Sequence, residues 1–190
     1  VLPLAASKAQ RGHALRDGTL DAPLRARPPQ WGKDVSLRGM VQPLLGEMFA
    51  QFTANLNAVL HSDDPELVHQ ARVGWRRFRG ALRLLRPAVP LHGLPAWQGL
   101  QPMLALLGAL RDLDVASTQT LPGLQSAFVA DDAARAAQWQ AMEQAFQAAT
   151  LLQRQALRRA LQEPAVGAAL LAITLWLADL ARPQAWGEAQ

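Results

Sequence analysis

The cationic side chains with the most regular spacing lie within residues 66–87, ELVHQARVGWRRFRGALRLLRP. They recur at alternating steps of three and four residues and are His69, Arg72, Arg76, Arg79, Arg83 and Arg86, here called the basic ridge. A helix places residues with this spacing along one face. The ridge would span roughly 21 Å between Arg72 and Arg86, which is longer than a single phosphate or a nucleotide requires. The pattern therefore predicts a binding site for an elongated anion.

Arginine has the chemistry that such a site needs, because its planar guanidinium donates paired hydrogen bonds to phosphate and stays charged. The ordinary alternative is a solvated helix face. Such faces usually interleave acids one turn from the bases, and no acid follows Glu66 in this stretch. Arg77 belongs to the same stretch and is included among the predicted ligands. His69 either gains charge below neutrality, which would make binding pH-sensitive, or packs as a neutral side chain.

The stretch that carries the ridge has the start and stop signals of a helix. Asp64 can cap the first turn, Pro65 suits the first helical position, and Pro87 ends the helix. An apolar stripe precedes the ridge by one residue at each step and comprises Val68, Ala71, Trp75, Phe78, Leu82 and Leu85. The two stripes would lie about 100° apart around the helix axis. One face is therefore predicted to enter the core and the other to meet an anion.

The remaining sequence also favours helices, and the predicted fold class is all-α. Half of the residues (50%) are hydrophobic, with abundant Ala and Leu. Further helices are predicted at residues 36–61, 96–117, 131–161 and 164–182, with a chain break at residues 121–123 and Asp131 as a cap. The core side of residues 131–161 is predicted to be Trp139, Met142, Phe146, Ala149, Leu152, Ala156 and Leu157. Residues 1–34 are interpreted as an irregular linker, 35–183 as the helical domain and 184–190 as an irregular tail.

Three arginines outside the ridge are further candidate ligands. Arg111 lies on the third predicted helix, and Asp114 follows it by three residues. A carboxylate beside a phosphate site is unfavourable unless a base pairs with it, so Asp114 is interpreted as structural. Arg154 and Arg158 are one turn apart and could widen the basic surface. Solvated cations near the end of their helix are an equal alternative.

Composition restricts the other functions. The net charge is only +4, so the basic character is local to the ridge. The absence of cysteine excludes disulfides and thiolate metal sites, and it fits a reducing, cytoplasmic location. No acid cluster with metal-ligand spacing, phosphate-binding glycine loop or nucleophile motif is recognisable, so no catalytic residue, metal site or cofactor is predicted. The apolar run at residues 165–178 is shorter than the ~20 residues of a membrane span, so no membrane partner is expected.

Two segments resemble a known family. Residues 66–79, with the pattern ExxHQxRVxxRRxR, resemble the signature of the CHAD domain, the conserved-histidine α-helical domain. Residues 108–115, GALRDLDV, are similar to the second segment of that family, GxxRDxDV. The resemblance implies an all-helical fold built like a pair of four-helix bundles. It also implies a non-catalytic module that binds inorganic polyphosphate through basic helix faces.

The resemblance also bears on the extent of the domain. A complete CHAD domain has a second His- and Arg-rich helix, and nothing after Pro87 repeats the pattern HxxRxxxxxxR. The chain is therefore expected to hold the first half of the domain, a four-helix bundle, plus a fifth helix. Residues 7–15, SKAQRGHAL, resemble the end of the CYTH triphosphatase module in proteins that fuse CYTH to CHAD. That likeness implies a triphosphatase partner in the same protein, and the implied ligand is compatible with polyphosphate granules.

Two other partners remain open for the basic ridge. A DNA backbone also attracts basic helices. The ridge lacks the Asn, Gln and exposed aromatic side chains that read or stack bases, with Gln70 alone nearby, so nucleic acid is the weaker candidate. An acidic protein could bind the same face.

Overall fold

The computed structural model describes residues 7–30, 32, 35–87 and 93–182, and within them all regular structure is helical. The α-helices are α1 (Lys8–Arg16), α2 (Leu37–Val59), α3 (Pro65–Leu85), α4 (Gln101–Val115), α5 (Leu121–Val129), α6 (Ala133–Leu161) and α7 (Pro164–Asp179). A 3-10 turn, Gln98–Leu100, leads into α4, and a π-helical turn, Ala116–Thr120, joins α4 to α5. The predicted all-α fold class is confirmed.

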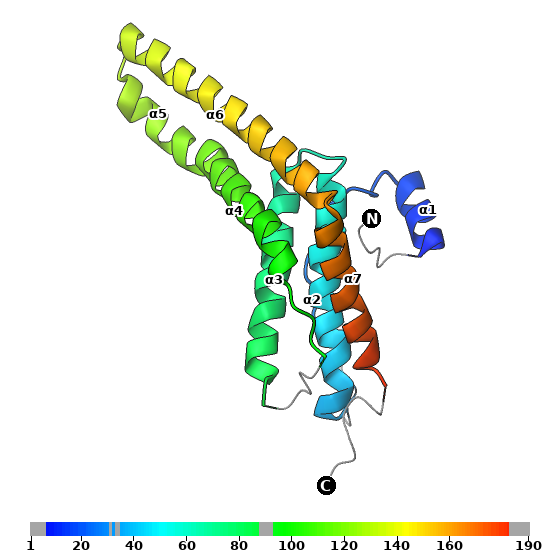
Figure 1. The fold of residues 1–190 in the computed structure, drawn as a ribbon. Coiled ribbons are helices and arrows are strands. Elements are labelled where there is room, and N and C mark those ends of the chain that lie inside the picture. The colour runs from blue at the N-terminus through cyan, green and yellow to red at the C-terminus, as the bar shows by residue number, and fades with distance from the viewer. Residues whose placement is uncertain (1–6, 31, 33–34, 88–92, 183–190) are drawn as a thin grey trace.

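The helices form two parts (Figure 1). In the first part α2, α3 and α7 run side by side, and the start of α4 packs against them. In the second, α4 and α5 continue as one long rod that runs beside α6, away from the first part. The main core lies between the helices of the first part, where the completely buried side chains include Leu45, Phe52, Leu56, Leu67, Phe78 and Leu170. The helix predicted at residues 164–182 is thus an integral member of the bundle.

Local signals and core packing together fix the orientation of α3. The Asp64 carboxylate accepts a hydrogen bond of 2.8 Å from the Glu66 backbone N–H, which caps the helix as predicted. The predicted apolar stripe is buried from Val68 through Leu82, and Leu85 is half-buried. Burial of each large apolar side chain stabilises the fold by roughly 1.5–3 kcal/mol. Since the stripe must face inward, the basic ridge is held outward.

A glycine allows α2 and α3 to pack closely. A Cβ placed on Gly74 would lie only 2.7 Å from the backbone nitrogen of Phe52 and 3.0 Å from the Met48 carbonyl oxygen. Aromatic rings then fill the interface, with Phe52 and Trp75 5.0 Å apart and Phe49 and Phe78 5.3 Å apart between ring centroids. Rings at these separations attract one another beyond the effect of area burial. This contact anchors the helix that carries the ridge.

The connection between α4 and α6 differs from the prediction in two respects. The chain break predicted at residues 121–123 is wrong, because Pro122 falls in the first turn of α5, where its missing N–H costs no helical bond. The cap of α6 is Asp132, whose Oδ1 accepts hydrogen bonds from the N–H groups of Ala134 and Arg135 at 2.8 and 3.2 Å. Asp131, predicted as the cap, lies in the turn before it with a φ of 63°.

α6 is less buried than its periodicity predicts. Trp139 and Leu157 are buried as expected, but Ala149 and Leu152 are exposed. Among the described residues, the N-terminal part of α6 packs against the α4–α5 rod on one side and is otherwise uncovered (Figure 1). No single helix in the described ranges is long and apolar enough to cross a membrane; α6 and α7 pass that test only as a pair, which is bent by 62°.

The N-terminal segment is more ordered than the predicted irregular linker. It contains α1, and further on Leu24 is held against α2 by the buried side chain of Asn55. The Leu24 N–H donates to Asn55 Oδ1 at 3.0 Å, and Asn55 Nδ2 donates to the Leu24 carbonyl at 2.9 Å. The pair of bonds ties this segment to the bundle. The predicted tail at residues 184–190 lies outside the described residues.

Candidate functional site

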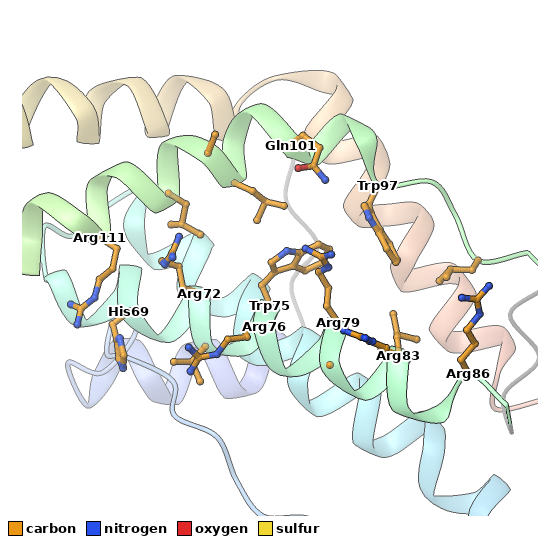
Figure 2. Close-up of a pocket in the computed structure, with 17 residues that line it drawn as sticks. His69, Arg72, Trp75, Arg76, Arg79, Arg83, Arg86, Trp97, Gln101 and Arg111 are labelled. Atoms are coloured by element: carbon orange, nitrogen blue, oxygen red, sulfur yellow. The ribbon is translucent and has the colours of Figure 1, made fainter.

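α3 and α4 border a groove of about 1080 Å³, and the basic ridge forms one wall of it (Figure 2). Its cationic lining consists of His69, Arg72, Arg76, Arg79, Arg83, Arg86 and Arg111. Arg111 comes from α4, whereas the others come from α3 or from the residue directly after it. The structure therefore brings the whole ridge together with an arginine that lies distant in sequence. The six arginines of this set are called the groove arginines below.

The groove arginines lack carboxylate partners. Within the described parts of the chain, none of the six forms an ion pair or a hydrogen bond, and no Asp or Glu lines the groove. Five of them are exposed, and Arg111 is half-buried. Like charges gathered on one face repel each other, and an anion that bridges them relieves the repulsion. The electrostatics of the groove therefore favour a multivalent anion.

The floor of the groove is apolar and firmly packed. Trp75 on α3 meets Trp97, just before the 3-10 turn, edge to face with ring centroids 6.0 Å apart. Leu104 and Leu107 on α4 complete the floor. Charges beside a low-dielectric surface are screened less than charges in bulk water, so the field of the arginines is strengthened at the groove. The tryptophans serve packing, because Trp75 is buried and Trp97 is half-buried against it.

Arg77 lies outside the groove, contrary to its inclusion among the predicted ligands. Its Nη1 donates to Gln51 Oε1 at 2.7 Å, and its Nη2 lies 3.3 Å from Glu47 Oε2. Gln51 is fully buried in α2 and donates in turn to Gln70 Oε1 at 2.8 Å. One residue corresponds to about 100° around a helix, so Arg77 faces α2 while Arg76 faces the groove. Arg77 therefore links α3 to α2.

Arg154 is likewise a structural residue and not part of the groove. Its side chain is only 5% exposed, and its Nη2 lies 3.3 Å from Oδ1 of Asp114, which is 4% exposed. Its Nε lies 3.5 Å from Asp63 Oδ1. Burial raises the pKa of the Asp114 carboxyl, and the positive charges of Arg154 and Arg111 offset only part of that effect. Asp114 is thus structural, as predicted, and its partner comes from α6.

Arg158 extends this network to the end of α2. Its Nε donates to the Val59 carbonyl at 2.8 Å. Its Nη2 donates to the Ser62 carbonyl at 3.0 Å and to Asp63 Oδ1 at 2.8 Å. The carbonyls at a helix C-terminus have no partner within the helix, and a guanidinium satisfies them. Arg158 therefore fastens α6 to the α2–α3 connection and does not widen the basic surface.

Trp97 and Gln101 are groove residues that helical periodicity does not predict. They precede and begin α4, and both line the groove opposite the ridge. Their role depends on how α4 crosses α3, which local periodicity does not reveal. No group of three or more His, Asp or Glu side chains in the described residues could hold a metal ion.

Comparisons with known proteins identify the family and agree with the helical fold. The family model described as the CHAD domain matches residues 43–190. Among solved structures, the chain is similar to the crystal structure of the CHAD domain from the plant Ricinus communis, with a TM-score of 0.66 and 29% sequence identity. That match covers 84% of this chain and 52% of the plant chain, so this chain spans about half of the matched protein. No curated protein matches the sequence.

Proposed function

The chain belongs to the CHAD domain family, and from this premise we propose that it is a non-catalytic module that binds inorganic polyphosphate in the groove between α3 and α4. The observation that carries the proposal is the set of groove arginines, which lack carboxylate partners among the described residues. A linear polyanion places negative charge along the whole row, whereas a single phosphate is shorter than the row.

The two walls of the groove suit such a ligand. Arginine forks on α3 approach a phosphate chain from one side, and Arg111 approaches it from the other. Each guanidinium can donate two parallel hydrogen bonds to a phosphate group. No base-reading surface is needed, which fits a groove whose only side-chain amide in the described lining is that of Gln101. Duplex DNA is the comparison ligand that tests this distinction.

The proposal is tested by titrating the protein with long-chain polyphosphate and with duplex DNA of matched total charge, at low and at physiological ionic strength. We expect polyphosphate binding to survive physiological salt while DNA binding collapses, because contacts to a fitted chain are screened less than diffuse attraction. Equal and equally salt-sensitive binding of both polymers would overturn the proposal of a dedicated site.

A paired variant locates the site. Arg76→Ala combined with Arg79→Ala removes two groove arginines that contribute nothing to the core, so polyphosphate affinity should fall while the melting temperature stays unchanged. The matched control is Arg135→Ala combined with Arg159→Ala, which removes the same charge from exposed positions on α6 outside the groove. Equal losses in the two double variants would point to net charge alone and against the groove.

A further inference from the structure

Arg72 reaches from α3 across the groove to the backbone of α4 (Figure 2). A Cβ placed on Gly108 would lie 2.8 Å from Arg72 Nη1 and 3.9 Å from its Cζ. Heavy atoms essentially never approach a Cβ as closely as the first of these distances. The guanidinium therefore occupies the space that a side chain at position 108 would fill.

We infer that Gly108 is a positioning residue for anion binding, which leaves open the space where the Arg72 guanidinium lies, about one turn of α4 from Arg111. Arg111 follows Gly108 by three residues, a rise of roughly 4.5 Å along α4. Arg72 lies against α4 at Gly108. Guanidinium groups from α3 and from α4 therefore line the same part of the groove. This inference rests on the proposed function, because it identifies what leaves room for one of the groove arginines at the α4 wall.

Within the described part of the chain, a side chain at position 108 would collide with Arg72 alone. Both atoms within 4 Å of the added Cβ belong to the Arg72 side chain, and neither belongs to the backbone or to the core. Arg72 is exposed and has no hydrogen-bond partner in the described residues, so it can swing away at little cost to the fold. An added methyl group would therefore displace the ligand-binding side chain without disturbing helix packing.

The expected effects on stability and on binding have opposite signs, which separates positioning from a structural role. Alanine favours the interior of a helix more than glycine does, so Gly108→Ala should raise the melting temperature or leave it unchanged. The same variant should bind long-chain polyphosphate about three- to tenfold more weakly, the range expected for loss of one partly screened, charge-assisted contact. A purely structural glycine would lose stability together with binding.

Gly80→Ala is the matched control. Gly80 also lines the groove, on α3, but a Cβ there would meet nothing within 4 Å. This variant makes the same chemical change and brings the same helical preference, yet it should weaken polyphosphate binding less than Gly108→Ala does, because it displaces no arginine. Equal weakening by both substitutions would overturn the inference, because it would show that any added methyl group in the groove blocks the anion.

A double-mutant cycle connects the effect to its stated cause. Polyphosphate affinity is measured for the full chain as wild type, Gly108→Ala, Arg72→Ala and the combination of the two. If Gly108 acts through Arg72, the combined variant binds no more weakly than Arg72→Ala alone. Independent, multiplying losses, or wild-type affinity in Gly108→Ala, would overturn the inference.

A measurement without ligand keeps this inference distinct from the proposed function. The side-chain Nε–H resonance of Arg72 in the ligand-free protein should shift in Gly108→Ala and stay in place in Gly80→Ala. If the wild type fails to bind polyphosphate, the proposed function fails, while a shift confined to Gly108→Ala still supports the positioning of Arg72. An unchanged Arg72 resonance in Gly108→Ala overturns the inference whatever the binding data show.

Discussion

Arg154 and Asp114 form a buried ion pair between α6 and α4, with Arg154 Nη2 3.3 Å from Asp114 Oδ1. One atom of each group, Arg154 Nη1 and Asp114 Oδ2, is buried without a hydrogen-bond partner among the described residues. Such a pair is expensive to bury but more expensive to break, because removal of one member leaves the other charged and desolvated. The pair therefore holds the C-terminal part of α6 against α4, the helix that forms one wall of the groove.

Removal of the arginine should destabilise the protein. Arg154→Ala leaves Asp114 without its nearest cation and opens a cavity, so we expect the free energy of unfolding to fall by about 3 kcal/mol. Urea unfolding measures this loss. Arg159→Ala, at an exposed position on the same helix, should change the value by less than about 0.5 kcal/mol. An Arg154→Ala variant that is as stable as the wild type but binds polyphosphate more weakly would contradict this, and would mean that Arg154 is a ligand.

The buried carboxyl should give the fold a distinct pH dependence. Burial raises the pKa of Asp114 above its usual value of 3.8, so the folded protein holds this proton more tightly than the unfolded chain does. The resulting stability is complete below pH 3.8 and is lost as the pH rises through the higher pKa of the folded state. The wild type should therefore lose stability relative to Asp114→Asn as the pH rises from that value toward neutrality. A difference that is constant with pH, or that grows in favour of the wild type, would contradict this assignment.

Arg76 and Arg77 are adjacent in the chain and should behave in opposite ways. Arg76→Ala should weaken polyphosphate binding and leave thermal unfolding unchanged, since the side chain lines the groove and is exposed. Arg77→Ala should lower the free energy of unfolding by about 1–2 kcal/mol, because it removes the bonds to buried Gln51 and to Glu47. Calorimetric unfolding and a polyphosphate titration of both variants test the pair. If both lost affinity without loss of stability, the opposite orientation of the two side chains would be refuted.

The contact between α2 and α3 gives a further test. Gly74→Ala would place a Cβ 2.7 Å from the backbone nitrogen of Phe52, which cannot move without separating the helices. We expect a loss of about 1–3 kcal/mol in the free energy of unfolding. Gly80→Ala, on the same helix with open space around it, should instead be neutral or stabilising by up to about 1 kcal/mol. Equal changes in the free energy of unfolding for the two substitutions would mean that helix propensity alone, and not the close contact of α2 and α3, determines the effect.

The orientation of α3 could be predicted from sequence because the two stripes share one period. The step from Val68 to Ala71 to Trp75 parallels the step of the ridge, and burial of one stripe determines the other. The same reasoning, applied strictly, would have excluded Arg77, since it is adjacent to Arg76 and so lies about 100° away. The angular position of a residue around the helix thus predicts a groove ligand better than its place in the basic stretch does.

The environment of Arg154 and Arg158 could not be predicted in this way. Their partners, Asp114 and Asp63, lie 40 and 95 residues away in the chain, and only the packing of α6 against α4 and against the α2–α3 connection brings them together. Periodicity within a helix gives the relative directions of its side chains, but it does not show which other residues each side chain contacts. For the same reason periodicity predicts a buried Leu152, although the core does not extend to its level of α6.

The groove arginines have a consequence for handling the protein. A row of positive charges without ion-pair partners among the described residues makes the ligand-free fold least stable in dilute buffer, where little screening is available. Any ion that binds the folded state alone raises its melting temperature by mass action. Phosphate and sulfate buffers would thus both protect the protein and compete with its ligand, so affinities measured in them would be systematically too weak. Melting curves measured in a buffer of bulky organic ions, with and without added phosphate, would test this. A higher melting temperature with phosphate would show that phosphate binds the folded protein.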